Sequence, residues 1–274
     1  MCAGRAALWA TIAGFPHYRC TDCRHLFVSP PPSEQELEKF YQDSSFYDAA
    51  LDQRERVVRD FEHRLDVLEQ FSNGGMPRTL LDVGCAAGLF LERAKRRGWT
   101  AEGVERSGDL AAAAAARSGA AVHRGRLEDA PDASFGAVVS WEVIEHVADA
   151  RTFFRHLAGR VEAGGILALS TPLSTGIPAR VMGTRFPMLC PPEHLRLFSR
   201  ASLRRLAEEH GLAEIHYESF SNLDRESLAS GFHRLGMGSA LSRFAAGSLG
   251  WAPALVDRLG WGSEMVVAFR KPAA

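Results

Sequence analysis

Apolar and polar residues recur along this chain with two different periods, and each period predicts a different kind of element. Short apolar runs predict buried strands near residues 79–83, 99–104, 120–123, 136–141 and 165–170. Between them, apolar residues spaced three or four positions apart predict helices near residues 88–97, 107–117 and 149–160. Strands and helices that alternate in this way form a parallel sheet with helices on both faces.

The flanking segments extend this core. Ser33 and Glu36 have the spacing of a capping box, which predicts a helix over residues 34–41. Apolar periodicity also predicts helices over 48–71 and 202–209, strands over 212–217 and 264–269, and short helices over 222–262. The segment 171–193 is rich in proline and glycine, which predicts a loop. We therefore expect an α/β fold with a doubly wound, mostly parallel, seven-stranded sheet of the Rossmann-like type.

Breaks in composition divide the chain into four expected units. The run Pro30-Pro31-Pro32 closes the first unit, and the glycine-rich segment 73–77 opens the core. The four units are a ribbon-like segment over 1–32, helices that form a lid over 33–77, a ligand-binding core over 78–220, and a helical insertion with the last core strand over 221–274.

A glycine loop follows the first core strand. Asp82 ends the strand, Gly84 and Gly88 bracket the loop, and a helix begins at Leu89. A second acid, Glu105, follows the loop by about 20 residues, as in sites that bind a nucleotide-like ligand at the edge of a parallel sheet. An ordinary connection in some other doubly wound protein is the alternative interpretation of this loop.

The chemistry of the loop disfavours a dinucleotide. Its spacing is Gly-x-x-x-Gly, and Asp82 stands where it would repel a pyrophosphate. An acid there suits a ligand with a cationic amine and sulfonium and no phosphate, such as S-adenosylmethionine. Glu105 could accept both ribose hydroxyls in a bidentate contact. The competing hypothesis is an NAD-dependent oxidoreductase.

From Leu80 to Gly211 the chain resembles the class I S-adenosylmethionine-dependent methyltransferases. The segment 82–88 is similar to the first motif of that family, and Glu105 to its ribose-binding acid. Residues 125–131 resemble the segment whose backbone cradles adenine, and residues 134–141 resemble the fourth strand. The resemblance implies a cofactor site built from Asp82, Gly84, Cys85, Ala86, Gly88, Glu105, Arg126, Leu127 and Trp141.

Two departures from the family pattern affect this site. Ala86 replaces a common second glycine, so the loop must accommodate a methyl group near the ligand. Arg126 stands where an acidic residue is frequent, which removes the usual side-chain contact to adenine.

Acids and histidines gather after the fourth core strand. Glu142, Glu145 and His146 share one face if their segment is helical, and His194 lies in the later loop. These four residues could bind Mg²⁺, Mn²⁺ or Fe²⁺. Their spacing resembles two subgroups described as using a divalent metal there, the ubiquinone-pathway O-methyltransferases that act on polyprenyl phenols and the small-RNA terminal 2′-O-methyltransferases.

A metal-free site is the alternative. His146 or His194 would then accept the proton of the substrate, with Glu142 beside them. In either case we expect methyl transfer to a hydroxyl of a small molecule, rather than to carbon or nitrogen. A non-catalytic module that keeps the cofactor fold and binds a partner is the third hypothesis.

Cys20 and Cys23 form a Cys-x-x-Cys pair, which is half of a zinc ribbon. The first half is incomplete, because Cys2 is present but Arg5 occupies the position of its partner. His17 or His25 could supply a fourth zinc ligand. A degenerate ribbon that binds no metal is the alternative.

Composition and charge limit the kinds of binding partner and cellular compartment that we expect. A net charge of −1 argues against a general nucleic-acid binder. The odd number of cysteines suggests a reducing compartment, so we expect a cytoplasmic protein, either a monomer or a homodimer. We expect Cys85 and Cys190 to be structural. An apolar stripe with arginines and tryptophans over 232–262 could contact a membrane surface, although packing against its own domain is the more common role.

Overall fold

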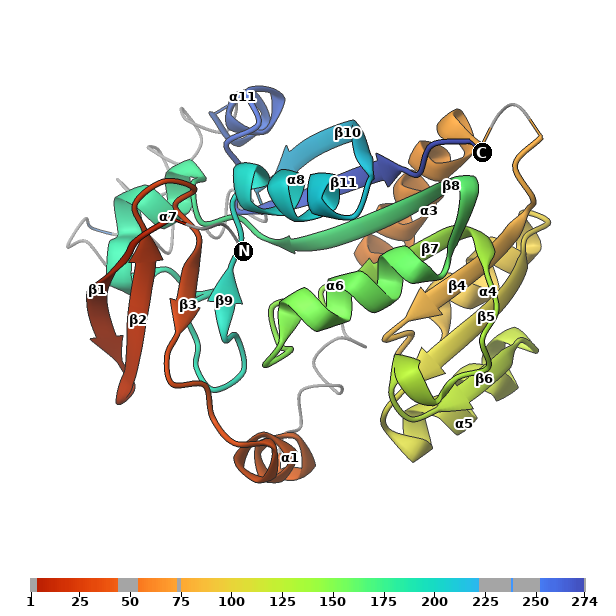
Figure 1. Cartoon of the computed structure of the whole chain (residues 1–274), viewed down its shortest axis with the longest axis horizontal. Coiled ribbons are helices and arrows are strands. Elements are labelled where there is room, and N and C mark those ends of the chain that lie inside the picture. Colours follow the sequence, from red (N-terminus) through yellow and green to blue (C-terminus); the bar gives the residue numbers. More distant parts are fainter. Residues whose placement is uncertain (1–3, 44–53, 73–74, 222–237, 239–251, 274) are drawn as a thin grey trace.

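Figure 1 shows the computed structural model of the chain, which describes residues 4–43, 54–72, 75–221, 238 and 252–273. Its main sheet has seven strands in the order β10-β11-β8-β7-β4-β5-β6. The strands are β4 (Thr79–Val83), β5 (Thr100–Glu105), β6 (Ala121–Arg124), β7 (Phe135–Trp141), β8 (Val161–Pro172), β10 (Ala213–Phe220) and β11 (Glu264–Arg270). Six of them run in the same direction, and β11 alone of these seven strands runs antiparallel to its neighbours β8 and β10. The expected doubly wound, mostly parallel sheet is confirmed.

Helices cover both faces of this sheet (Figure 1). One face carries α3 (Arg54–Phe71), α4 (Leu89–Arg96) and α5 (Gly108–Ser118). The other carries α6 (Ala150–Gly159) and α8 (Arg200–Glu209). Each face of the sheet has its own hydrophobic core, and successive residues of a strand point to opposite faces. Leu80 therefore packs in the core with α3, whereas Leu81 packs in the core with α6. Each helix therefore buries its apolar face against the sheet.

Shorter elements surround the sheet. They are α1 (Glu34–Asp43), α7 (Ile177–Met182), α11 (Ala252–Arg258) and the 3₁₀ turns η1 (Leu127–Asp129) and η2 (Gly183–Arg185). The predicted capping box of α1 is present, since Glu36 N donates to Ser33 Oγ and Ser33 N donates to the Glu36 carboxylate. Within the described residues, no helix combines the length and apolarity needed to cross a membrane.

A second sheet forms at the N-terminus. It contains β1 (Ala6–Ile12), β2 (Phe15–Cys20), β3 (Leu26–Val28) and, from much later in the chain, β9 (Arg196–Leu197). We call these four strands the N-terminal sheet. Because β3 pairs with β9, the first 30 residues are attached directly to the segment that follows His194.

The structure differs from the expected elements in three places. Residues 171–193 were predicted as a loop but contain α7 and η2. Pro178 suggested a loop, but it lies in the first turn of α7, where a helix accepts proline. β8 begins at Val161, four residues before the strand predicted near 165–170, and so includes Gly164. Most of the predicted helices over 222–262, and the start of the helix predicted over 48–71, lie outside the described residues.

Gly88 provides a direct test of how this fold is packed. Its φ is +76°, and an added Cβ would lie 2.6 Å from the Cα of Ala114 in α5. We expect Gly88→Ala to lower the free energy of unfolding by about 2–4 kcal/mol, because backbone strain adds to a clash with main chain. Urea unfolding followed by circular dichroism measures this.

Gly98→Ala is the matched control. Gly98 has a similar φ of +83° but nothing within 4 Å of an added Cβ, so the substitution should cost only about 1 kcal/mol. Equal losses in the two variants would show that close packing at Gly88 is unimportant.

Candidate functional site

The glycine loop lies at the carboxyl edge of the main sheet, where β4 meets β5 and β7. The chain reverses its strand order here, which is where open α/β sheets bind ligands. The backbone N–H groups of Gly84 and Cys85 both donate to the Val104 carbonyl oxygen, at 2.8 and 3.2 Å, and hold the loop against β5. Ala86 adopts a left-handed φ of +46°, so the loop tolerates the extra methyl group in a conformation usually taken by glycine.

Two acidic side chains, Asp82 and Glu105, face this loop and differ in their hydrogen bonds. Asp82 is only 1% exposed, and its Oδ2 atom has no hydrogen-bond partner. Burial, reinforced by the charge of Glu105 and partly offset by Arg64, raises the pKa of Asp82 to about 8. A buried carboxyl that lacks a partner fits a ligand that brings a positive charge.

Glu105 is held in place by the backbone. Its Oε2 accepts from Ala86 N at 3.0 Å, and its Oε1 accepts from Ser107 N at 2.8 Å. Each oxygen keeps a further lone pair, so the carboxylate can still receive two hydroxyl donors. The loop and the acid therefore fit the ammonium and the ribose of S-adenosylmethionine.

Arg64 of α3 is a site residue that sequence reasoning missed. It is only 7% exposed, its guanidinium lies 4.9 Å from the centroid of the Trp141 ring, and its Nη2 atom lies 3.9 Å from Glu142 Oε1. The signal was an arginine three residues after Phe61 on the otherwise apolar face of a helix. A buried cation beside Asp82 could receive the carboxylate of an amino acid whose ammonium meets Asp82.

The remaining predicted cofactor residues lie around the same edge. Gly125 N donates to the Glu105 carbonyl oxygen at 3.0 Å, which brings the next residues to the end of β5. Leu127 there is buried, whereas Arg126 is exposed. The Cys85 thiol packs over Gly103, and burial raises its pKa, so it is an inert structural group.

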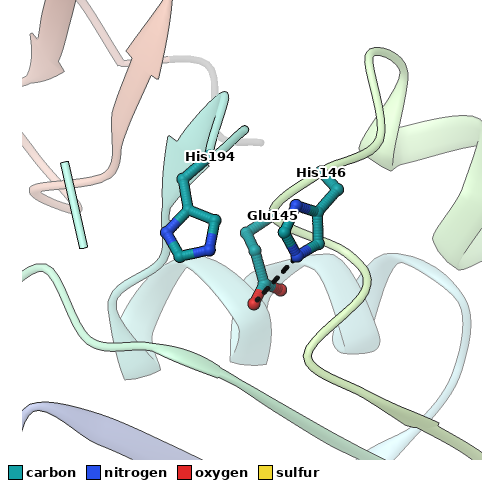
Figure 2. A group of neighbouring side chains, drawn as sticks. All are labelled: Glu145, His146 and His194. Atoms are coloured by element: carbon teal, nitrogen blue, oxygen red, sulfur yellow. Dashed lines mark ion pairs between the residues drawn. The ribbon is translucent and has the colours of Figure 1, made fainter. Parts of the chain in front are cut away.

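Glu145, His146 and His194 form a tight cluster at the neighbouring strand end, shown in Figure 2. One ligand atom from each lies within 4.8 Å of the others. The segment 142–146 is a turn, not a helix, and Glu142 has a φ of +53°. Glu142 was expected to share a face with the other two only if this segment were helical. That condition is not met, and Glu142 lies outside the tight cluster.

Both imidazoles are oriented by carbonyl oxygens. His146 Nδ1 lies 2.9 Å from the Glu193 carbonyl oxygen, and His194 Nδ1 lies 2.8 Å from that of Met188. These contacts assign the proton to Nδ1 and leave Nε2 as the basic nitrogen of each ring. Burial, and then the neighbouring His194, lower the pKa of His146 to about 4, so this ring is neutral near pH 7.

Glu145 is fully buried, and its Oε1 atom lies 4.0 Å from His146 Nε2, beyond hydrogen-bond distance (Figure 2). Burial, and then the charge of Glu142, raise its pKa well above the usual range. A carboxyl in this state needs a proton or a cation. Two imidazoles and one carboxylate fit a divalent ion, and this donor set suits Mn²⁺, Fe²⁺ or Zn²⁺ better than Mg²⁺, which prefers oxygen ligands.

The N-terminal sheet holds this cluster together from outside. Leu195 N donates to the Glu145 carbonyl oxygen at 2.9 Å, and the Leu195 carbonyl oxygen accepts from Val28 N at 2.8 Å. The residue after His194 is thus bonded to the turn on one side and to β3 on the other. His194 owes its position to contacts between three segments that are far apart in the sequence.

Cys20 and Cys23 are both buried at the end of β2 and in the turn that follows. In the described part of the chain, no third histidine, cysteine or acid joins them in a group tight enough to hold a metal, and Cys2 lies outside that part. His17 instead has its Nδ1 atom 2.9 Å from the Phe15 carbonyl oxygen. Zinc binding here stays a prediction.

Known proteins resemble this chain in sequence and in fold. A family described as methyltransferase domain matches residues 51–217. Ubiquinone biosynthesis O-methyltransferase from Aeromonas salmonicida is 27% identical over 179 residues, which is 58% of this chain and 75% of that protein. The protein of the same name from Azorhizobium caulinodans is 33% identical over 125 residues, 43% of this chain and 48% of its own. The chain thus spans about half the length of the second relative.

Solved structures share the fold. Magnesium protoporphyrin IX methyltransferase from Synechocystis PCC 6803, with bound S-adenosylhomocysteine, superimposes with a TM-score of 0.59 at 12% identity, over 87% of this chain and 100% of that one. A SAM-dependent methyltransferase from Archaeoglobus fulgidus gives 0.57 at 17% identity, over 83% and 100%.

Proposed function

This chain belongs to the methyltransferase-domain family of S-adenosylmethionine-dependent enzymes, and from that premise we propose that it methylates a hydroxyl oxygen of a small molecule. The observation that carries the proposal is the buried cluster of Glu145, His146 and His194 beside the glycine loop. A hydroxyl must lose its proton when its oxygen gains a methyl group, so a site for this reaction needs a base. The Nε2 atoms of His146 and His194 meet that need.

We propose that the cofactor binds through groups that are already in place. Asp82 would pair with its ammonium, Arg64 with its carboxylate, and Glu105 with its ribose hydroxyls. The backbone at Leu127 would lie against the adenine, and Trp141 would border the methionine end. S-adenosylmethionine supplies an electrophilic methyl group on sulfur. Its C–S bond breaks as the C–O bond forms, and the hydroxyl proton passes to His146 or His194.

Binding a divalent metal is a second role that we propose for the same cluster. Glu145, His146 and His194 would hold it, with Glu142 as a fourth group nearby. A metal there would lower the pKa of the substrate hydroxyl and orient it. The complete burial of Glu145 supports this role, because a cation would compensate a buried carboxylate.

The names of the relatives suggest a chemical class for the methyl acceptor and not a particular compound. Their name, ubiquinone biosynthesis O-methyltransferase, makes phenols and catechols the first compounds to test. None of the comparisons supports an NAD-dependent oxidoreductase. If the chain is instead a non-catalytic module, it should bind the cofactor without transferring a methyl group.

The test is methyl transfer from S-adenosylmethionine with a radiolabelled methyl group to a panel of acceptors. The panel contains a catechol, a simple phenol, an aliphatic alcohol, an amine and a thiol. We expect label on oxygen, with and without added Mn²⁺. Label only on nitrogen or sulfur would contradict O-methylation, and binding of S-adenosylhomocysteine with no transfer to any acceptor would favour the non-catalytic module.

Asp82 makes proton release a signature of ligand binding. With a pKa of about 8, its carboxyl is mostly protonated at pH 7 in the unliganded protein, whereas an ammonium partner favours the carboxylate. We expect S-adenosylhomocysteine to release up to one proton per molecule bound at pH 7. Calorimetry in buffers of different ionisation enthalpy measures it. Asp82→Asn should abolish the release, and Glu102→Gln on the neighbouring strand should not.

The same shift sets the pH dependence of stability. The unfolded carboxyl loses its proton near its ordinary pKa of 3.8, before the folded one does. The contribution of Asp82 to the unfolding free energy is therefore present at low pH and is lost as the pH rises toward 8. A stability that rises over this range in wild type relative to Asp82→Asn would contradict the assignment.

A further inference from the structure

A cavity of about 260 Å³ lies between the N-terminal sheet and the start of α6. Its polar lining comes from Cys20 and His25 on one side, Asp149 and Arg151 on another, and Arg196 of β9. The volume is below that of most pockets for drug-sized ligands, so a group of a few atoms is the appropriate occupant. No part of the proposed methyl transfer uses this cavity.

Arg196 lines the cavity as a cation with incomplete partners. Its Nη2 atom donates to the Ala148 carbonyl oxygen at 2.5 Å, but its buried Nε atom has no hydrogen-bond partner. Within the described residues, none of the ion pairs closer than 4.0 Å includes this guanidinium. A buried guanidinium with an unused N–H donor is costly unless an anion completes it.

Further groups complete the polar lining. His25 is 2% exposed and its ring bonds the Leu197 backbone, so it shapes the cavity and offers no free N–H donor. Arg151 adds a second guanidinium, which Glu209 holds at the rim. Asp149 is the one acid in the lining, and its Oδ1 atom is already used to accept from Thr152 N at 3.0 Å and cap α6.

We propose that this cavity binds a small oxyanion, a phosphate or carboxylate group, which accepts from Arg196 Nε and lies near Arg151. An Arg guanidinium with an unused donor is the group that proteins use for such planar, charge-assisted contacts. Arg196 bonds the turn that follows His146 and lies two residues after His194. The anion would therefore bind beside the catalytic cluster, either as a free ion or as an acidic group on the acceptor.

The test uses inorganic phosphate and the full chain. Phosphate is titrated by calorimetry, with sodium chloride at matched ionic strength as the blank. We expect saturable binding that weakens by about tenfold or more in Arg196→Gln, since one charge-assisted contact is lost. Arg204→Gln, an exposed arginine of α8 paired with Glu208, is the matched control and should bind as wild type does.

Arg196→Lys keeps the test decisive if the glutamine variant does not fold. It retains the charge but lacks the Nε–H donor, so its affinity should also fall. Phosphate that binds equally to wild type, Arg196→Lys and Arg196→Gln would overturn the proposal, as would the absence of saturable binding to folded wild type. Failure here leaves the methyltransferase assignment intact, because that is tested by label transfer.

Kinetics distinguish the two sources of the anion once an acceptor is known. If the site holds an acidic group of the acceptor, phosphate competes with that acceptor and Arg196→Gln raises its KM. If the site holds a free ion, phosphate does not compete, and the variant leaves the KM of a neutral acceptor unchanged. Both results support an oxyanion at Arg196.

Discussion

Replacing Glu105 with alanine should weaken the binding of S-adenosylhomocysteine by at least about 100-fold. The substitution removes an acceptor for two ribose hydroxyls, and each hydrogen bond to a charged group contributes about 1.5–3 kcal/mol, so the loss is about 3 kcal/mol or more. It also removes the contacts to Ala86 N and Ser107 N that hold the loop and the start of α5. Loss of ligand contacts and loss of loop order act in the same direction.

Isothermal calorimetry with S-adenosylhomocysteine measures the effect. Glu102→Ala is the control, because Glu102 lies on the same strand but pairs with His123, away from the ligand edge. Circular dichroism must show that both variants are folded. Affinity within a few-fold of wild type in folded Glu105→Ala would remove the structural basis for cofactor binding at this edge.

Replacing His194 with glutamine should lower kcat by about 10²–10⁴-fold and leave the affinity for S-adenosylhomocysteine within about twofold. His194 supplies one of the two basic nitrogens in the cluster, and its ring lies 4.8 Å from that of His146 between ring centroids. It lies outside the glycine loop, so cofactor affinity should not change. His123→Gln is the control, since that histidine pairs with Glu102 on the sheet edge.

Glu145→Gln separates the two roles of the cluster. The substitution preserves shape and removes the negative charge. If a metal binds there, the variant should lose Mn²⁺ binding and as much activity as His194→Gln, and chelation should inactivate wild type. If the histidines act without metal, Glu145→Gln should keep most of its activity and chelation should have no effect. An active, metal-independent His194→Gln would show that the cluster does not act in methyl transfer.

Much of the fold and half of the site could be predicted from local sequence. The strands and helices of the core have strong periods, and the order of Asp82, Gly84, Gly88 and Glu105 reflects one β-α-β unit. Such units bring their own residues together, because the connection between parallel strands has a fixed hand and places both strand ends at one edge. Predicting the two carboxylates of the candidate cofactor site therefore required no information from distant parts of the chain.

The N-terminal sheet shows where local patterns fail. The burial of β1 and β2 does not alternate from one residue to the next, and β3 and β9 have only three and two residues, so none of these strands has a strong period-two pattern. No local signal could show that β3 pairs with residues about 170 positions later in the chain, because strand pairing is decided by packing as well as by propensity.

What the sequence by itself determined is the doubly wound sheet, its ligand edge and the carboxylates that suit a cationic cofactor. Only the tertiary structure decided how His194, which the resemblance grouped with Glu145 and His146, reaches them, that Arg64 of α3 lies beside Asp82, and that Arg196 faces a cavity. The reason is physical. Periodicity records which face of an element is buried, whereas the partners across that face depend on how distant elements pack. Here, a helix before the sheet and a segment between β8 and β10 supply groups whose spatial neighbours neither burial nor spacing could assign.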